Sequence, residues 1–403
     1  MKPKSTLAEI EQFIKEFSDT FEHADTRFEI WENVKFTQVG DNLILTGKVA
    51  FTDLFEQLER HFPDQTFING FIELPNLPEE FTEKEYGFVI QGYVNLRREP
   101  NHRSELLSQL SLGWPLMLLE VSGEWVRVVN HLDGYYGWVH RGGIWCCSED
   151  EVNELTQYLD GTYRISRGFT HILDTSGARQ ASQIWIGPGA LIASWDEMPP
   201  LMTTDSVKQV LHYSMLPDDS VIVVESEDYE AIDKIYIPLL TEERTEMPIN
   251  PNAYELWMGT PYLWGGNTMG GMDCSGFIQL YALCNGYFAP RDADRQYRSS
   301  AVEQDLSIEQ LAEYDLLFFA EPGKKVSHVA LHIGEGRFVH ADSHLRYNSL
   351  NPAHDDFAQK RLDTWVGVGK MSGFPTADLP ALCDVLFFRR SHFAKSQLCG
   401  TEH

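Results

Sequence analysis

Apolar and polar positions alternate differently in three parts of the chain, and the first part mixes helix-like and strand-like spacing. The expected elements there are, in order, a helix at 5–22, strands at 27–36 and 42–51, a helix at 53–62 and a strand at 66–74. A turn is expected at Gly40-Asp41, and a linker at the proline-bounded stretch 75–78. We therefore predict a small αββαβ domain over residues 1–80.

The second part is rich in short strand-like runs that turn residues separate. The runs GYVNLRREP, PLMLLEVSGEWVRVV and DGYYGWVH follow one another closely, and Ser122-Gly123 has the composition of a hairpin turn. A further β-rich block includes SQIWIGPGALIASW and SVIVVES. Strands of this length and spacing are typical of small barrels. We predict one barrel over residues 86–160 and a second over residues 161–245.

The third part, residues 246–403, begins with helical spacing. Apolar side chains recur at intervals of three and four beyond Cys274, and Asn285-Gly286 supplies a stop signal. Residues 274–285 are therefore expected to form a helix with Asp273 as its N-cap. The positive end of the helix dipole favours a thiolate at Cys274, whereas the carboxylate of Asp273 opposes it.

A hairpin is expected at residues 326–340, VSHVALHIGEGRFVH. If Gly334-Glu335-Gly336 forms a three-residue loop, Ile333 pairs with Arg337 and Ala330 lies opposite His340. His328 is then diagonal to His340 on the same face, within reach of a contact between two imidazoles. A two-residue loop would place His340 on the other face and separate them.

Charge and cysteine content narrow the functional classes. The chain carries 60 acidic and 32 basic residues among 403, a net charge of −28, which disfavours nucleic acid and anionic lipid as partners. Thr6 and Glu9 read as a helix capping box, so the N-terminus predicts a helix start and not a signal peptide. Six cysteines are too few for a disulfide framework, and no stretch is apolar enough to span a membrane. A cytoplasmic protein with a small or neutral ligand is expected, and the oligomeric state is left open.

Cysteine at a helix start beside two strand histidines suits acyl transfer. Cys274 would attack a carbonyl, His328 would take and return the proton, and His340 would orient His328. An alternative is a zinc site formed by His328, His332 and His340. Structural zinc sites prefer paired Cys or His at short spacing, and Cys274 has no such partner. We therefore expect no metal and no cofactor.

Four runs of sequence carry a family resemblance: PYLWGGNTMGGMDCSGFIQLYALCNG, PRDADRQ, DLLFFA and SHVALHIGEGRFVHA. In this order they resemble the catalytic domain of the NlpC/P60 cysteine peptidases. The resemblance implies an α+β chain whose residues 246–403 form a papain-like domain. It also implies a triad of Cys274, His328 and His340, with Tyr262 beside the oxyanion site.

Upstream, NLRREPNHRSELLSQLSLGW and DGYYGWV resemble the bacterial SH3 domain of cytoplasmic γ-D-glutamyl-L-diamino acid endopeptidases. This implies that the two barrels are SH3-like. It also implies a murein tripeptide or tetrapeptide substrate with a free N-terminal L-Ala, cut between γ-D-Glu and meso-diaminopimelate or L-Lys during wall recycling. The positions that match the substrate-binding residues of this group are Glu105, Tyr135, Asp273, Ser275, Arg291 and Asp292.

Three details of that resemblance stay open. Tyr136 competes with Tyr135 for the cleft, although Tyr135 is in register with the family motif. Arg291 is expected close to the D-Glu carboxylate, either in contact or one layer behind. Ala293 stands where relatives often carry serine, so one substrate hydrogen bond is expected to be missing.

Two other functions remain as alternatives. The same fold supports amidases and acyltransferases, because a Cys-His pair does not by itself select the acceptor. A non-catalytic protein that binds peptides through its SH3-like barrels is the second alternative, and the three filled triad positions argue against it.

Overall fold

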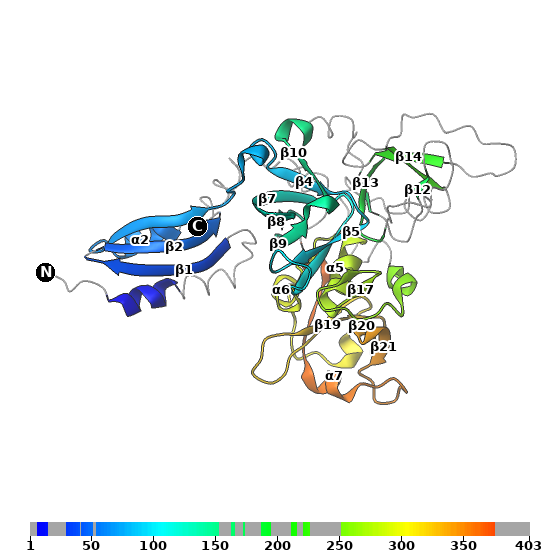
Figure 1. Ribbon diagram of the computed structural model, residues 1–403. Helices are drawn as coiled ribbons and strands as arrows, with labels where there is room; N and C mark the ends of the chain where they lie inside the picture. The colour runs from blue at the N-terminus through cyan, green and yellow to red at the C-terminus, as the bar shows by residue number, and fades with distance from the viewer. Residues whose placement is uncertain are drawn as a thin grey trace, which may run out of the picture.

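A computed structural model describes residues 6–14, 30–40, 42–50, 54–152, 163–165, 172–173, 187–194, 211–215, 221–225 and 251–374. Figure 1 shows a blue N-terminal sheet at one side, cyan barrel strands in the middle and the yellow to orange C-terminal part below them. Within these ranges no helix is long and apolar enough to cross a membrane.

The N-terminal elements follow the predicted order. Residues 7–14 are helical, and the rest are β1 (Ile30–Val39), β2 (Asn42–Ala50), α2 (Leu54–His61) and β3 (Thr66–Glu73). β2 is central, antiparallel to β1 and parallel to β3. Parallel neighbours need a crossover, which α2 supplies by packing its buried Leu54 and Leu58 in one cluster with Leu43 and Leu45.

The first β-rich block forms one seven-stranded sheet in the order β10-β4-β7-β8-β9-β5-β6. Its strands are β4 (Tyr86–Val89), β5 (Tyr93–Arg97), β6 (Leu106–Ser111), β7 (Pro115–Ser122), β8 (Trp125–Asn130), β9 (Tyr136–His140) and β10 (Ile144–Cys147). The predicted turn at Ser122-Gly123 is confirmed, since Ser122 pairs with Trp125 across it. Gly123 has a φ of 58°, a left-handed conformation that glycine adopts without strain.

The second β-rich block is described only in part. Its strands are β11 (Tyr163–Ile165), β12 (Ile172–Leu173), β13 (Leu191–Ser194), β14 (Leu211–Met215) and β15 (Val221–Glu225). They form one antiparallel sheet in the order β11-β13-β14-β15-β12. The residues between them lie outside the described ranges, so a second barrel stays a prediction.

The C-terminal part combines a buried helix with an antiparallel sheet. The helices are α5 (Cys274–Leu283), α6 (Ala293–Ser299) and α7 (Gln359–Thr364). The strands are β16 (Asn267–Thr268), β17 (Gly271–Met272), β18 (Leu316–Phe319), β19 (His328–His332), β20 (Arg337–Asp342), β21 (His344–Ser349) and β22 (Trp365–Gly369). The five-stranded sheet has the order β21-β20-β19-β18-β22. Short 3-10 helices are η1 (Glu79–Phe81), η2 (Arg141–Gly143), η3 (Ala253–Trp257), η4 (Ile308–Gln310) and η5 (Met371–Gly373).

The hairpin of β19 and β20 has the predicted register. Leu331 pairs with Val339, and the N–H of Ile333 donates to the carbonyl of Arg337 (2.9 Å), so the loop is the three-residue Gly334-Glu335-Gly336. Both loop glycines have positive φ. His328 and His340 consequently share one face of the sheet, as predicted.

Helix α5 is buried along its whole length, because the barrel strands cover one side of it and the sheet β18 to β22 the other. Its predicted N-cap is confirmed: the Asp273 carboxylate accepts the N–H of Gly276 at 2.7 Å. A Cβ at Gly276 would lie 2.1 Å from the carbonyl oxygen of Gly266. Glycine at this position therefore lets the start of the helix approach the loop before β16.

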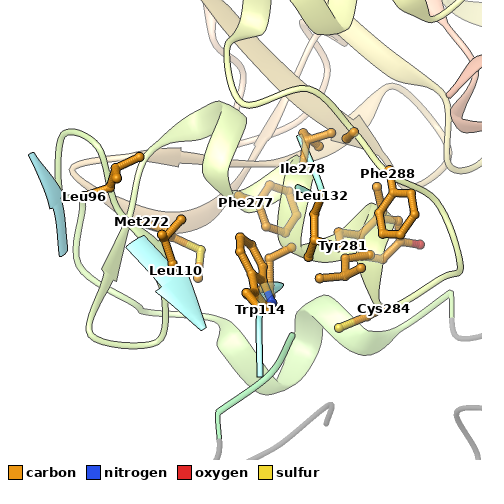
Figure 2. Packing of buried hydrophobic residues seen from close by; sticks show 14 of the residues in the cluster. Leu96, Leu110, Trp114, Leu132, Met272, Phe277, Ile278, Tyr281, Cys284 and Phe288 are labelled. Carbon is orange, nitrogen blue, oxygen red and sulfur yellow. The ribbon is translucent and has the colours of Figure 1, made fainter. Parts of the chain in front are cut away.

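One apolar core joins the barrel to α5 (Figure 2). Trp114 and Leu132 from the barrel segment lie in a single buried cluster with Phe277 and Tyr281 of α5. The indole N–H of Trp114 donates to the carbonyl of Gly189 at 2.7 Å, so this polar atom is satisfied within the core. The barrel is thus fixed against the helix whose first residue is Cys274.

Candidate active site

Cys274 begins α5 and is 7% exposed. Its Sγ lies 4.0 Å from the carbonyl oxygen of Ser327, and the backbone N–H of Val329 also faces the thiol. These two residues flank His328, so the backbone around the expected base lines the expected nucleophile.

Burial controls the charge state of this pair. It raises the pKa of the Cys274 thiol to about 12, with the Asp273 carboxylate acting in the same direction. Burial also lowers the pKa of His328 well below 6.5, helped by the nearby charge of Arg361. In the substrate-free protein, burial therefore outweighs the effect of the helix dipole, which favours the thiolate. Both shifts favour the uncharged forms of the thiol and of the imidazole in the substrate-free protein.

The two histidines form one hydrogen-bonded chain with an asparagine. His328 Nε2 and His340 Nδ1 are 2.7 Å apart, and His340 Nε2 is 2.9 Å from Asn348 Oδ1. The Asn348 amide donates to the carbonyl of Asp356 at 2.8 Å, which identifies Oδ1 as the acceptor for His340.

The tautomers of His328 and His340 are inferred from these hydrogen-bond partners. His340 carries its proton on Nε2, so its Nδ1 accepts the proton carried by His328 Nε2. His328 Nδ1 is then the unprotonated nitrogen, the form required of a general base.

Asn348 was not predicted from the sequence. Extending the pairing past Asp342 onto β21 would have placed it diagonal to His340.

His332 has a different role from its two neighbours. Its Nδ1 donates to the carbonyl of Ala312 (2.6 Å), and its Nε2 accepts the N–H of Gly336 (3.2 Å). Both ring nitrogens thus hold backbone around the hairpin loop. The zinc alternative required His332 as a ligand, and this arrangement does not provide one.

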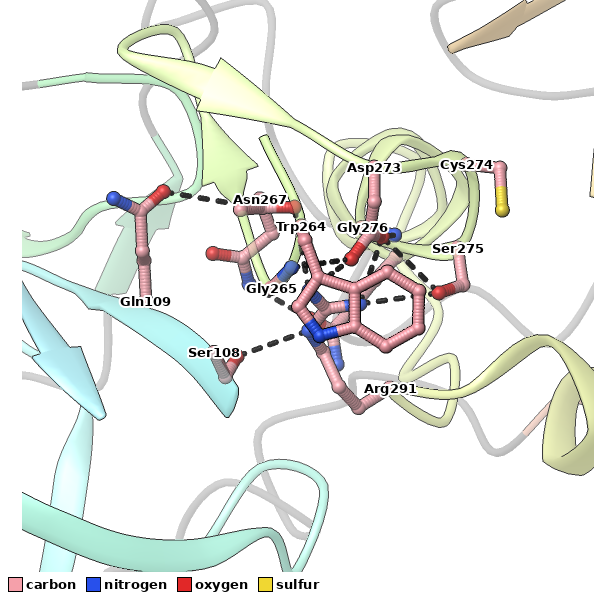
Figure 3. A network of polar contacts seen from close by, with 12 residues as sticks. Ser108, Gln109, Trp264, Gly265, Asn267, Asp273, Cys274, Ser275, Gly276 and Arg291 are labelled. Atoms are coloured by element: carbon pink, nitrogen blue, oxygen red, sulfur yellow. Dashed lines mark hydrogen bonds and ion pairs between the residues drawn. The ribbon is translucent and has the colours of Figure 1, made fainter. Parts of the chain in front are cut away.

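Arg291 lies beneath the nucleophile, 2% exposed. Its Nη atoms contact both carboxylate oxygens of Asp273, at 3.0 and 2.8 Å, and Nη1 also donates to Ser275 Oγ at 3.1 Å. Nη2 reaches the carbonyl of Gly266 (3.3 Å), and Nε reaches Ser108 Oγ in β6 (3.1 Å). Figure 3 shows this network, with the Cys274 thiol pointing away from it.

These contacts use all five N–H groups of the guanidinium. Arg291 therefore has no donor left for a substrate carboxylate, and of the two possibilities the structure favours a position one layer behind. Asp273 and Ser275, also buried, hydrogen-bond to each other at 3.2 Å. The geometry makes this trio a support for the start of α5 and for the loop that Gly266 belongs to, and its part in substrate binding stays a prediction.

A second buried polar network ties the barrel to α5. Gln279 of α5 donates to Asp133 Oδ2 at 2.7 Å and accepts from Asn267 at 2.8 Å. The other oxygen of Asp133 accepts the backbone N–H of Tyr135 at 2.9 Å. The position of Tyr135 is consequently set by a residue bonded to the nucleophile helix.

Tyr135 meets Asp292 at the top of this junction. Its hydroxyl lies 3.1 and 3.2 Å from the two carboxylate oxygens, and burial raises the pKa of Asp292. Tyr136 instead packs in the cluster of Ala50 and Leu119, on the N-terminal side of the barrel. The structure thus selects Tyr135 over Tyr136 as the tyrosine that faces the catalytic part.

Glu105 stands nearby on the barrel, just before β6. Its Oε1 accepts the indole N–H of Trp264 at 3.0 Å, and its Oε2 accepts Nε of Arg98 at 2.7 Å. Neither Arg98 nor Trp264 was singled out from the sequence, and for Trp264 no sequence pattern shows that its distant segment meets Glu105.

Tyr262 is 37% exposed and lies near Cys274. Burial and the nearby Cys274 raise the pKa of its phenol to about 12, so it is a hydrogen-bond donor at neutral pH. Its backbone N–H donates to the carbonyl of Ser343 at 2.9 Å, which joins this loop to the turn after β20. Ala293, at the start of α6, is buried and offers no side-chain hydrogen bond.

Comparisons with known proteins match both functional regions. Residues 259–364 match the NlpC/P60 family, and residues 96–144 match the bacterial dipeptidyl-peptidase SH3 domain. The chain is 27% identical over 254 residues to a γ-D-glutamyl-L-lysine dipeptidyl-peptidase of Bacillus cereus, covering 59% of this chain and 68% of that protein. It is 25% identical over 291 residues to dipeptidyl-peptidase 6 of Lysinibacillus sphaericus, covering 70% and 98%.

A solved structure shares the fold. The crystal structure of an NlpC/P60 family protein from Bacillus cereus superposes with a TM-score of 0.54 at 19% identity, covering 71% of this chain and 99% of that one. Together with the sequence matches, this establishes that the chain carries an NlpC/P60 cysteine peptidase domain and, ahead of it, a bacterial dipeptidyl-peptidase SH3 domain.

Proposed function

We propose that this protein is a cysteine endopeptidase that cleaves the bond between γ-D-Glu and the diamino acid in murein peptides with a free N-terminal L-Ala. The observation that carries the proposal is the contact between Tyr135 of the SH3 domain and Asp292 of the peptidase domain. Through this contact the half-buried carboxylate of Asp292, next to Arg291 in the sequence, faces the SH3 domain. The names of the two curated relatives support the same reaction class.

The proposed reaction begins with proton transfer from Cys274 Sγ to His328 Nδ1 as sulfur attacks the γ-carbonyl carbon of D-Glu. The resulting oxyanion is stabilised by the backbone N–H at the start of α5 and by the Tyr262 hydroxyl. Collapse breaks the C–N bond, and His328 returns its proton to the amine of the diamino acid, which leaves. Water, deprotonated by the same histidine, hydrolyses the thioester and restores the thiol.

His340 and Asn348 would act through His328. The imidazolium that forms at His328 donates from Nε2 to His340 Nδ1, the contact already present at 2.7 Å. Asn348 holds His340 in the tautomer that accepts this proton. We therefore propose His340 as the orienting member of the triad and Asn348 as its positioning residue.

Substrate selection would depend on charge. An ammonium moved out of water needs carboxylate or hydroxyl partners, because an unpaired buried charge is very unfavourable. Asp292 of the peptidase domain, together with Tyr135 and Glu105 of the SH3 domain, would provide such partners. The L-Ala amine of intact peptidoglycan is amide-linked to muramic acid and carries no charge. We infer that the enzyme acts after an amidase has released the peptide, in cytoplasmic wall recycling.

The experiment is product analysis by mass spectrometry with L-Ala-γ-D-Glu-L-Lys and its diaminopimelate counterpart. Release of L-Ala-γ-D-Glu and the free diamino acid is expected. The N-acetylated peptides are the matched control, and the loss of a desolvated charge pair should lower kcat/KM for them by about thirtyfold or more. Transfer to an added amine instead of water would favour the acyltransferase alternative. Cleavage between L-Ala and D-Glu would contradict the proposed bond.

A further inference from the structure

Glu105 already has a cation in the substrate-free protein. Arg98 Nε donates to its Oε2 at 2.7 Å, while Trp264 Nε1 occupies Oε1 at 3.0 Å. Both carboxylate oxygens are therefore engaged in the place where the proposed function puts the substrate ammonium.

The Arg98–Glu105 pair is exposed and local. The two side chains are 62% and 39% exposed, and their backbones are joined by Arg98 N–H donating to the Glu105 carbonyl at 3.1 Å. Exposed ion pairs add little stability, so such a contact can exchange for another cation with little loss. Trp264, 66% exposed, comes from the peptidase domain and contacts the carboxylate on its other oxygen.

Arg98 also lies towards the rest of the amine site. Arg98 lies within electrostatic range of the hydroxyls of Tyr135 and Tyr136, as well as of Glu105. Tyr135 in turn bonds Asp292. Arg98 thus stands at the exposed edge of the group of residues that would surround the ammonium.

We propose that Arg98 is a built-in counter-cation that competes with the substrate's N-terminal ammonium for Glu105 and sets how strictly the enzyme requires a free amine. This inference rests on the proposed function. With a free-amine peptide, the ammonium must displace the guanidinium, so the apparent affinity is reduced by the fraction of molecules in which Arg98 is bound. With an acetylated peptide, Arg98 stays on Glu105 and prevents an unpaired carboxylate.

Removing Arg98 should therefore move the two substrates in opposite directions. The free-amine peptide gains an available carboxylate, whereas the acetylated peptide meets one without a partner. A structural role for Arg98, holding β5 to β6, predicts a parallel loss for both peptides. The neighbouring Arg97 already links the end of β5 to the loop before β6, since its Nη1 donates to the carbonyl of Ser104 at 2.8 Å.

The test compares wild type, Arg98→Gln and Arg98→Lys with Arg103→Gln, a matched control in the same exposed loop. For Arg98→Gln, kcat/KM with L-Ala-γ-D-Glu-L-Lys should rise about twofold to fivefold through KM, the range an exposed ion pair can supply. With the N-acetylated peptide it should fall. Arg98→Lys should lie between, and Arg103→Gln should match wild type. An unchanged ratio of the two substrates, or a parallel fall of both rates, would overturn the inference.

Binding separates this inference from the proposed function. Calorimetric titration of Cys274→Ala, with and without Arg98→Gln, uses the free and acetylated γ-linked L-Ala-D-Glu dipeptides and needs no turnover. Failure of wild type to cleave the tripeptide would contradict the proposed function alone. The inference would still stand if Arg98→Gln tightens the free dipeptide and weakens the acetylated one, and would fall if both bind as before.

Discussion

Two arginine–carboxylate pairs lie near the candidate active site, and they differ in burial and in geometry. Arg291 and Asp273 are buried beneath the nucleophile, joined through both carboxylate oxygens. Arg98 and Glu105 are exposed on the SH3 domain and joined through one. The chemical groups are the same, but their degree of burial is not.

That difference sets what each pair can do. A buried pair is strongly destabilised when one partner is removed, because the other charge is left in an apolar surrounding. It therefore suits a scaffold that must not move, such as the start of α5. An exposed pair is nearly neutral in free energy and suits a place where a substrate cation must enter. By the same criterion of burial, the other polar residues of the site fall into two groups. The buried residues, which we call the fixed group, include Arg291, Asp273, His328 and His340. The exposed pair of Arg98 and Glu105 forms the exchangeable group.

The largest effect on activity is expected at Cys274, the residue that the fixed group supports. Cys274→Ala or Cys274→Ser should reduce turnover on the order of 10⁴-fold or more, because neither side chain supplies a sulfur nucleophile. The fold should persist, since both replacements are small. Activity assays beside far-ultraviolet circular dichroism would check this, and hydrolysis at the wild-type rate would contradict the assignment.

Substitutions along the hydrogen-bonded chain of His328, His340 and Asn348 should lower the rate less the farther the residue lies from Cys274. His328→Ala should lose about 10² to 10⁴-fold in kcat, the usual contribution of a general base. His340→Ala should lose less, since water can replace part of an orienting contact, and Asn348→Ala less again. Steady-state kinetics of the three variants gives the order. A larger loss for His340→Ala than for His328→Ala would mean that the two roles are exchanged.

Arg291→Met tests the buried pair directly. It leaves Asp273 without its partner and should lower the free energy of unfolding by about 3 to 5 kcal/mol. The double variant with Asp273→Asn should recover part of this loss, because no unpaired carboxylate remains. Chemical denaturation measures both. Equal stability of Arg291→Met and wild type would show that the pair is not a scaffold.

Mild acid should lower the free energy of unfolding through His340, at pH values above those at which most carboxylates titrate. Burial lowers the pKa of His340 to about 4, so at pH 5.5 the unfolded chain binds a proton there that the folded chain does not. Stability should therefore fall by about 1 kcal/mol for this residue between pH 7 and pH 5.5. Urea denaturation at both pH values, with His340→Gln as the control, measures the slope. The variant should show a smaller pH dependence, and an identical one would rule out this origin.

The smallest effect is expected at the exposed pair. Arg98→Gln should change the free energy of unfolding by less than about 1 kcal/mol, as is usual for surface ion pairs. Measured in the same denaturation series as Arg291→Met, it completes the comparison. A loss as large as that of Arg291→Met would place Arg98 among the fixed residues.

The sequence predicted those parts of the site that depend on local geometry. The N-cap at Asp273 and the register that brings His328 to His340 both follow from short-range patterns, and both are confirmed. Asn348 was missed because the turn at Ser343, with a φ of 66°, interrupts the pattern before β21.

Properties set by tertiary packing were beyond reach. The local sequence predicted opposing effects of the helix dipole and of the Asp273 carboxylate on the Cys274 thiol. It does not report the burial of α5, which is the largest cause of the raised pKa of this thiol. Arg291 saturates its donors with groups from three distant segments, and Trp264 meets Glu105 across the domain boundary. Such meetings depend on how the two domains dock.

The core that Trp114 and Leu132 share with Phe277 and Tyr281 limits how this protein can be taken apart. Two domains that meet through a polar surface can be recombined, with each part keeping its own folding information. Here helix α5 of the peptidase domain is buried partly by side chains of the SH3 domain. A chimaera that exchanges the SH3 domain for another would therefore have to inherit these contact residues as well, so substrate preference and solubility should be inherited together.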